Sequence, residues 1–132
     1  MSSILIVDDE PEIITLLRFV LEKDGHAISA AANGKVALEL LGIDPRQAVA
    51  RPDLIILDVM MPIMDGYTLN GLLQREDMTR SIPILVLTAK GQKMRDLFEM
   101  APNVAAYVQK PFDPKMLREL IIGILTGNSH RR

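Results

Sequence analysis

The fold of this chain is decided by the stretch Asp53-Leu54-Ile55-Ile56-Leu57-Asp58-Val59-Met60-Met61-Pro62. Residues 53–57 predict a buried strand, because the run from Leu54 to Leu57 is apolar at every position, as in parallel strands covered on both faces. An ionised Asp58 at the tip of such a strand cannot lie in the core. We therefore expect Asp58 to point out of the carboxyl end of the strand, where open α/β sheets bind their ligands.

The composition predicts a single globular domain. The 132 residues carry a formal net charge of −2 and are 48% hydrophobic, which suits one packed core and argues against direct binding of nucleic acid. The absence of cysteine excludes disulfides, a thiolate nucleophile and Cys-bound zinc. No apolar run approaches the roughly 20 residues that cross a bilayer, so we expect no membrane insertion and a soluble cytoplasmic protein. We expect residues 1–126 to form the domain and residues 127–132 to form a polar tail.

Strand and helix patterns alternate five times along the chain. Short apolar runs predict the strands, and apolar residues at helical spacing after each run predict five helices. The expected strands cover residues 3–7, 26–32, 53–57, 82–87 and 103–108. This alternation predicts an α/β fold, with a doubly wound five-stranded parallel sheet of flavodoxin-like order 2-1-3-4-5 and helices on both faces.

Particular residues mark individual helices. Asp9 is expected to cap the first helix and Asp113 the last, because a proline follows each of them within two residues. A fourth helix is expected around Met94, Leu97 and Phe98, which repeat at helical spacing.

Four strand ends carry polar side chains that a parallel sheet brings to one edge. Asp8 and Asp9 follow the first strand, Asp58 ends the third, Thr88 ends the fourth, and Lys110 follows the fifth. Three carboxylates raise each other's pKa, and a hard divalent cation such as Mg²⁺ relieves this repulsion. Acids, Mg²⁺, a lysine and a hydroxyl form a site for phosphoryl transfer. The phosphoryl group belongs either to a bound ligand or to Asp58 itself.

Each of these residues also has a structural interpretation. Asp8 and Asp9 suit a helix cap, Asp58 suits a turn, Thr88 suits a strand end, and Lys110 suits a solvated surface. For each residue alone, the structural interpretation is at least as good as the functional one. Their joint occurrence at successive strand ends favours the acidic pocket.

These strand ends resemble those of the receiver domain of bacterial two-component response regulators, the family of the chemotaxis regulators. The matching motifs are Ile6-Val7-Asp8-Asp9-Glu10, Leu57-Asp58-Val59-Met60-Met61-Pro62 followed by Met64-Asp65-Gly66, Leu87-Thr88-Ala89, and Lys110-Pro111-Phe112. The resemblance covers roughly residues 3–125. It implies a phosphorylation-dependent signalling switch of a phosphorelay. Such a switch is not a conventional enzyme, although it catalyses its own phosphorylation and dephosphorylation.

The resemblance implies a role for each acid in the pocket. Asp58 is the implied phosphoacceptor. The implied ligands of Mg²⁺ are Asp8, Asp9, Asp58 and the backbone carbonyl of Met60. From the residues alone, the side chain of Met60 is simply a filler of the loop.

The family pattern also implies how the phosphoryl group is bound and detected. Thr88 and Lys110 are implied to bind it. Thr88 and Tyr107 are the implied switch pair, in which the aromatic side chain swings inward as Thr88 moves. Tyr107 alone has a simpler interpretation as a half-buried packing residue. The family further implies a cis peptide bond between Lys110 and Pro111.

The implied partners act before and after this step. A phosphohistidine on a sensor histidine kinase or a histidine phosphotransfer protein is the implied donor, docked over the first helix and the loop after the fifth strand. The implied output is a changed surface of the fourth helix, fifth strand and fifth helix. A downstream protein reads this surface or, if the chain is truncated, a C-terminal output domain does. The residues of this chain that we expect to be exposed on that surface are Gln92, Arg95, Glu99 and Arg118.

Two segments depart from the receiver pattern. The segment between Asn33-Gly34 and Asp58 is several residues longer than is usual in this family. We place the extra residues within 43–51 and expect them to lie away from the pocket. The connection Ala101-Pro102-Asn103 lacks the glycine that is usual there. Met60 and Lys90 occupy the positions that tune the lifetime of the phosphorylated state in this family.

Two other functions compete with the switch. A Mg²⁺-dependent phosphatase or hydrolase with an aspartyl nucleophile also uses such acids. However, the haloacid dehalogenase type carries an Asp-x-Asp pattern after its first strand, and Asp8-Asp9-Glu10 lacks that spacing. A receiver-like binding module that is never phosphorylated is opposed by the complete set of pocket residues. A nucleotide-binding site is opposed by the lack of a glycine-rich loop after the first strand.

Overall fold

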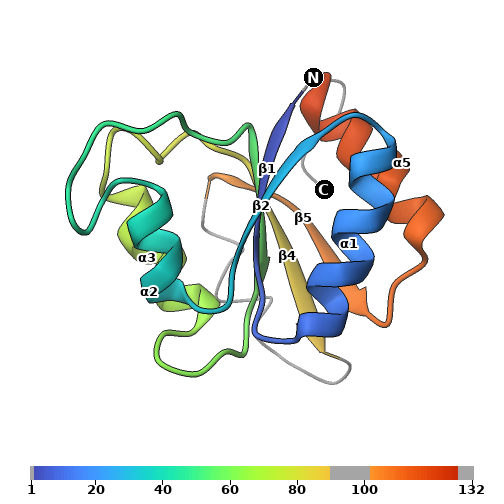
Figure 1. Ribbon diagram of the computed structural model, residues 1–132, viewed down its shortest axis with the longest axis horizontal. Coiled ribbons are helices and arrows are strands. Elements are labelled where there is room, and N and C mark those ends of the chain that lie inside the picture. Colours follow the sequence, from blue (N-terminus) through green and yellow to red (C-terminus); the bar gives the residue numbers. More distant parts are fainter. Residues whose placement is uncertain (1, 90–101, 128–132) are drawn as a thin grey trace.

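The computed structural model describes residues 2–89 and 102–127 (Figure 1). Strands and helices alternate along the chain as the sequence predicts. The elements are β1 (Ser3–Val7), α1 (Pro11–Lys23), β2 (Ala27–Ala31), α2 (Gly34–Leu40), β3 (Leu54–Asp58), α3 (Gly66–Gln74), β4 (Ile84–Ala89), β5 (Val104–Lys110) and α5 (Pro114–Leu125). The described residues thus contain four of the five expected helices. The fourth expected helix, around Met94, Leu97 and Phe98, lies outside them.

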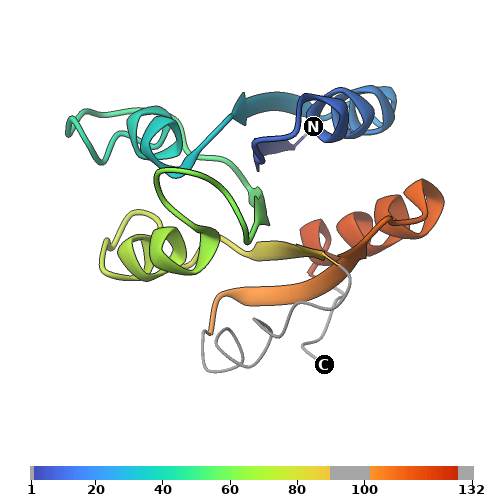
Figure 2. The ribbon, with the colours of Figure 1, turned by 90° about the horizontal axis from the view of Figure 1, so that it is seen from below.

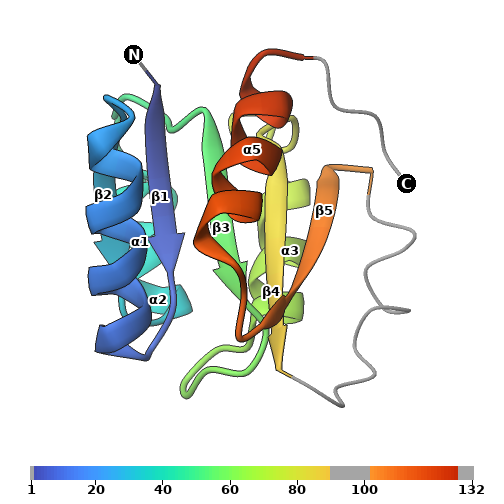
Figure 3. The same ribbon diagram turned by 90° about the vertical axis from the view of Figure 1, so that its right-hand side faces the viewer.

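The strands form one parallel sheet in the order β2-β1-β3-β4-β5, which confirms the predicted topology. Figure 3 shows them side by side, with α1 and α5 lying across the same face. Val7 pairs with Ala31 on one side and Leu57 on the other, while Asp58 pairs with Leu87. The carboxyl ends of the strands therefore meet at one edge of the sheet.

The fourth and fifth strands extend two residues further than the sequence predicts. Thr88 pairs with Gln109, and Ala89 pairs with Lys110. The polar side chains at these ends therefore project from regular strand backbone. This placement holds them more firmly than a loop does.

The core consists of two layers, one on each face of the sheet. Ile55 and Leu57 of β3 pack in the layer beneath α2 and α3, whereas Leu54 and Ile56 pack in the layer beneath α1 and α5. Figures 1 and 2 show these helix pairs on opposite sides of the strands. Complete burial of each such side chain contributes roughly 1.5–3 kcal/mol. The continuous apolar run thus fixes β3 at the centre of the sheet and leaves Asp58 at its edge.

The helix caps confirm one prediction and correct another. The side chain of Asp113 accepts a hydrogen bond from the backbone N–H of Lys115 at 3.0 Å, as expected of the cap of α5. The predicted cap at Asp9 is wrong, because the N-cap of α1 is Glu10 and no side chain caps it. Asp8 instead accepts the backbone N–H of Glu10 at 2.9 Å, which fixes the turn between β1 and α1. The expected cis bond between Lys110 and Pro111 is present.

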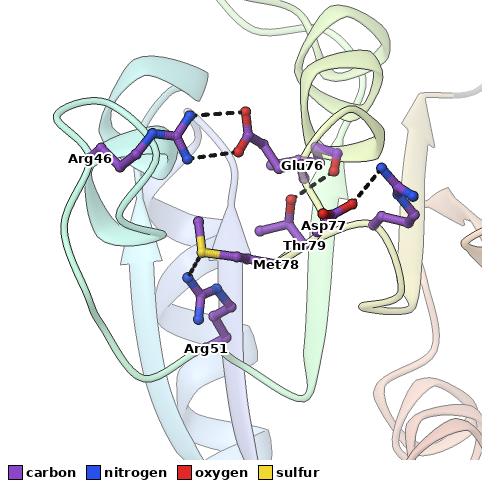
Figure 4. Close-up of polar contacts among 8 residues, drawn as sticks. Arg46, Arg51, Glu76, Asp77, Met78 and Thr79 are labelled. Atoms are coloured by element: carbon purple, nitrogen blue, oxygen red, sulfur yellow. Dashed lines mark hydrogen bonds and ion pairs between the residues drawn. The ribbon is translucent and has the colours of Figure 1, made fainter.

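The long segment 43–51 packs against the connection between α3 and β4, as Figure 4 shows. Arg46 donates two hydrogen bonds to the carboxylate of Glu76, at 2.9 and 3.2 Å, and Arg51 contacts the sulfur of Met78. These two connections lead into the amino ends of β3 and β4. The extra residues therefore lie at the edge of the sheet opposite Asp58, as predicted.

None of the helices described in residues 2–89 and 102–127 has the length and apolar character needed to cross a membrane.

Candidate functional site

Three of the predicted site residues meet at the carboxyl edge of the sheet. Asp8 directly follows β1, Asp58 is the last residue of β3, and Lys110 is the last residue of β5. The Lys110 ammonium lies 3.0 Å from Oδ2 of Asp8 and 3.4 Å from Oδ1 of Asp58. Asp8 is fully buried and Asp58 is 4% exposed. A cation between two buried carboxylates compensates charges that could not otherwise remain inside the protein.

Glu10, for which the sequence predicts no role, joins this group. Its Oε1 accepts a hydrogen bond from Nζ of Lys110 at 2.7 Å, the shortest contact of that ammonium with the pocket acids. Glu10 was visible only as the third acid of the Asp8-Asp9-Glu10 run. The turn that Asp8 fixes through the Glu10 backbone brings the Glu10 side chain back over the strand ends.

Asp9 and Met60 are the other two predicted ligands of Mg²⁺, besides Asp8 and Asp58. Asp9 is exposed, and its charge acts on Asp58, where it helps to raise the pKa of that carboxyl. Met60 follows β3 with an exposed side chain. Their roles as Mg²⁺ ligands, by a carboxylate and a backbone carbonyl, stay predictions.

Thr88 and Tyr107 lie on the neighbouring strands β4 and β5. Thr88 is half-buried one residue before the end of β4. Tyr107 pairs with Val86 and packs against the core layer beneath α2 and α3. The packing interpretation of Tyr107 therefore holds in this conformation, while its role in switching stays a prediction.

Burial dominates the electrostatics of the pocket. Burial, with the neighbouring charge of Asp8, raises the pKa of Asp58 to about 7. Burial also raises the pKa of Asp8, against the opposing effects of the Glu10 N–H and Lys110. For Lys110, burial alone would lower the pKa. Its contacts with Glu10 and Asp8, together with the charges of Asp58 and Asp8, outweigh this effect and raise the pKa. Lys110 therefore stays protonated, whereas the neighbouring acids make it harder for Asp58 to lose its proton.

The donor set of the pocket fits a hard divalent cation. Asp8, Glu10 and Asp58 each offer a carboxylate oxygen, and these oxygens lie within 4.8 Å of one another. Oxygen donors of this kind suit Mg²⁺, which one or two carboxylates commonly hold together with water and phosphate oxygens. The pocket thus has the chemistry of a magnesium site, with a lysine already lying among its acids.

One residue expected on the output surface, Arg118, is exposed on α5 as predicted, but it is paired within the domain. Arg118 donates two hydrogen bonds to Asp24 at the end of α1, at 2.6 and 2.9 Å. The guanidinium also lowers the pKa of Asp24. Arg118 therefore ties α5 to α1 through an ion pair in which its own side chain is 44% exposed. The other three expected residues, Gln92, Arg95 and Glu99, lie outside the described part of the chain.

The chain is thus a doubly wound parallel sheet of flavodoxin-like topology, with acids and a lysine gathered at its carboxyl edge. The sequence pattern of the response regulator receiver domain matches residues 4–122 of this chain. The chain belongs to the receiver domain family, whose members act as phosphorylation-dependent switches in two-component signalling and interact with sensor histidine kinases.

Relatives of known sequence support this assignment. The alkaline phosphatase synthesis transcriptional regulatory protein PhoP of Bacillus subtilis is 35% identical over 124 residues, which are 94% of this chain and 48% of PhoP. The response regulator SaeR of Staphylococcus aureus is 33% identical over 126 residues, which are 96% of this chain and 51% of SaeR. The chain thus spans about half the length of these curated relatives.

Solved structures share the fold over nearly their whole length. The receiver domain of a signal transduction histidine kinase from Syntrophus aciditrophicus is similar with a TM-score of 0.83 and 31% identity. The match covers 96% of this chain and 92% of that one. The receiver domain of the sensor histidine kinase PA1611 from Pseudomonas aeruginosa, solved with a magnesium ion coordinated in its active-site cleft, has a TM-score of 0.81 and 28% identity. That match covers 95% of this chain and 98% of that one.

Proposed function

We propose that Asp58 accepts a phosphoryl group from a phosphohistidine, in a reaction that depends on Mg²⁺ and that this domain itself catalyses. The observation that carries the proposal is the contact between the almost fully buried Asp58 and the ammonium of Lys110, 3.4 Å apart at the carboxyl edge of the sheet. A structural aspartate at a turn has no need of a largely covered lysine beside it. A carboxylate that receives a phosphoryl group needs such a cation, because the reaction adds negative charge.

The transfer is a displacement at phosphorus. A carboxylate oxygen of Asp58 attacks the phosphorus, and the new O–P bond forms as the N–P bond to the donor imidazole breaks. The electron pair of that bond stays on the imidazole nitrogen, which takes up a proton from water. The later hydrolysis of the phosphorylated Asp58, with water as the nucleophile, returns the domain to its resting state.

The other pocket residues serve this step by position and charge. Asp8, Asp9, Asp58 and the backbone carbonyl of Met60 are the proposed ligands of Mg²⁺. When bound, Mg²⁺ neutralises charge on the phosphoryl oxygens. Lys110 pairs with one of these oxygens, and the hydroxyl of Thr88 donates a hydrogen bond to another. The charge that Asp58 gains is thus shared by groups at the ends of four neighbouring strands, β1, β3, β4 and β5.

Thr88 couples this step to the output surface. When its hydroxyl turns toward the phosphoryl group, the space beside β5 changes, and the Tyr107 side chain moves inward. The surface formed by β5, α5 and the fourth helix is then recognised differently by a downstream protein or by a further domain of a longer chain. Such a switch acts by shifting the population between two arrangements of the same elements.

The phosphodonor docks on α1 in this proposal. Pro11, Leu16 and Phe19 line a shallow hollow along the helix, and 38% of Leu16 and 59% of Phe19 are exposed. The hollow begins at the first turn of α1, directly after Glu10, and so adjoins the pocket. A helix of a sensor histidine kinase or of a histidine phosphotransfer protein can cover it and bring the phosphohistidine to Asp58.

Intact mass spectrometry after incubation with acetyl phosphate tests the function. We expect a gain of one phosphoryl group that requires Mg²⁺ and is lost in Asp58→Ala. The variant Asp77→Ala, which removes an exposed aspartate in the α3–β4 connection, is the matched control and should still be phosphorylated. Phosphorylation of Asp58→Ala would falsify the assignment. Steady turnover of unrelated phosphate esters would instead indicate a phosphatase.

A further inference from the structure

The closest acidic partner of Lys110 in the pocket is Glu10 and not the proposed phosphoacceptor. The three distances from its ammonium are 2.7 Å to Glu10, 3.0 Å to Asp8 and 3.4 Å to Asp58. The side chain of Glu10 is 50% exposed, whereas those of Asp8 and Asp58 are 0% and 6% exposed. Glu10 thus holds the ammonium from the rim of the pocket, while the two aspartates hold it from inside.

The backbone of Glu10 is fixed on both sides. Its N–H donates to Oδ1 of Asp8 at 2.9 Å, and its carbonyl accepts the N–H groups of Ile13 and Ile14 at 3.1 and 3.2 Å. The carboxylate therefore extends from an anchored point at the start of α1. A fixed backbone lowers the entropy lost when the side chain holds the lysine.

Lys110 and a divalent cation require the same carboxylates. An ammonium between Asp8 and Asp58 repels a cation that approaches either oxygen, at distances where Coulomb energies are large. The ammonium cannot move away without a partner, because only 13% of the Lys110 side chain is exposed. Glu10 provides such a partner at the edge of the pocket.

We propose that Glu10 is a positioning residue that draws Lys110 toward the rim of the pocket and so lets the cation share Asp8 and Asp58. The inference rests on the proposed function of the pocket and adds Glu10 to it as a residue that acts through Lys110. Without the Glu10 charge, the ammonium settles on the two aspartates, and the cation must displace it.

The first test follows the Lys110 side chain by NMR in protein with ¹⁵N-labelled lysine. In the wild type, we expect the Lys110 ammonium to be protected from proton exchange both without and with saturating Mg²⁺. Glu10→Gln should shift this resonance in the metal-free protein and accelerate its exchange in the Mg²⁺-bound protein. Glu12→Gln, which removes an equal charge one residue into α1, is the control and should leave the resonance unchanged. An unchanged resonance in Glu10→Gln under both conditions overturns the proposal.

The second test measures the dissociation constant of Mg²⁺ by NMR titration. Glu10→Gln should weaken Mg²⁺ binding by about three- to tenfold, in line with the loss of one partly exposed charge pair. In a Lys110→Met background, the same substitution should change the constant by about twofold or less. An equal loss in both backgrounds would mean that Glu10 acts directly on the cation, and it would overturn the positioning role.

The two tests separate this inference from the proposed function. A wild-type protein that binds no Mg²⁺ contradicts the metal site itself, and the metal-free resonance of Lys110 then still tests its pairing with Glu10. Mg²⁺ binding without coupling between Glu10 and Lys110 contradicts only the inference. Circular dichroism of each variant establishes that it is folded before the titration.

Discussion

Gly66, the first residue of α3, lies directly against the backbone of Asp58. A Cβ atom at Gly66 would overlap the carbonyl oxygen of Asp58, and the N–H of Gly66 donates to the carbonyl of Val59 at 2.8 Å. The start of α3 thus supports the end of β3 by direct backbone contact. We expect Gly66→Ala to displace Asp58 and to destabilise the fold by about 1–3 kcal/mol, the usual cost of overpacking. Urea denaturation and phosphorylation by acetyl phosphate should both reveal this effect.

A second glycine of the same helix provides the control. In the described part of the chain, no atom beyond the local backbone of α3 lies within 4 Å of a Cβ placed at Gly71. Gly71→Ala should therefore stabilise the protein by roughly 0.5–1 kcal/mol, because alanine favours the helix. Equal effects of the two substitutions would show that helix propensity, and not contact with Asp58, sets the requirement at Gly66.

Ile63 has a left-handed backbone conformation in the loop after β3. Its φ is +73° and 76% of the residue is exposed. A β-branched residue in this conformation is strained, and its exposed side chain gains little packing in return. Glycine relieves this strain, but it also increases the conformational entropy of the unfolded chain, which lowers stability. As the net effect, we expect Ile63→Gly to raise the free energy of unfolding by about 0.5–1 kcal/mol.

Ile63→Ala is the control for this prediction. It removes the same exposed side chain but keeps a Cβ atom, so it should relieve only the part of the strain that comes from β-branching. If the alanine variant gains as much stability as the glycine variant, backbone strain at Ile63 is not the cause.

The sequence predicted the parts of the site that strand polarity determines. Asp8, Asp58 and Lys110 each stand at the end of an apolar run, and parallel strands must bring such ends to one edge. The same reasoning predicted the central position of β3, because a run that is apolar on both faces has to be covered twice. These conclusions required only periodicity and the direction of the chain.

Features that depend on the reach of a long side chain were not predicted. Glu10 binds Lys110 across 100 positions of sequence, and Arg118 binds Asp24 across 94. Apolar periodicity does not determine which way an exposed Glu or Arg extends, so neither contact leaves a signal in the sequence. The predicted cap at Asp9 was wrong because α1 begins at Pro11, so that Glu10 is its N-cap.

The stability of the metal-free protein should depend on the ionisation of Asp58. Burial and the charge of Asp8 raise its pKa from an ordinary value of 3.8 to about 7. A raised carboxyl pKa means that the unfolded state loses the proton first as the pH rises. The contribution of Asp58 is therefore fully present below about pH 4 and is lost toward pH 7, with a decrease of up to about 4 kcal/mol. Urea denaturation in EDTA at a series of pH values measures this decrease in the free energy of unfolding.

Asp58→Asn isolates this contribution, because asparagine does not titrate. The variant should lose less stability than the wild type between pH 4 and pH 7, and the difference should shrink when Mg²⁺ replaces EDTA, since a bound cation favours the ionised carboxyl. Parallel pH profiles of the two proteins in EDTA would show that Asp58 keeps an ordinary pKa.

Asn70 and Asn103 form a buried amide pair that joins α3 to the start of β5. The Asn103 amide donates to Oδ1 of Asn70 at 2.8 Å, and the Asn70 amide donates back at 3.5 Å. Gln74 adds a third hydrogen bond, to Oδ1 of Asn103 at 3.2 Å. Asn103 occupies the connection that lacks the glycine of the receiver pattern. The amide pair therefore ties this connection to α3 through side-chain hydrogen bonds.

Asn103→Ala should destabilise the protein by about 1–3 kcal/mol, because it leaves the buried carbonyl of Asn70 without its donor. The double substitution of Asn70→Leu with Asn103→Ala should cost less than the sum of the two single substitutions, since it removes both polar partners at once. Gln74→Ala is the milder control, because Asn70 and Asn103 keep each other as partners. Guanidinium denaturation of the four variants measures these differences, and strictly additive losses would mean that the two asparagines stabilise the fold independently of each other.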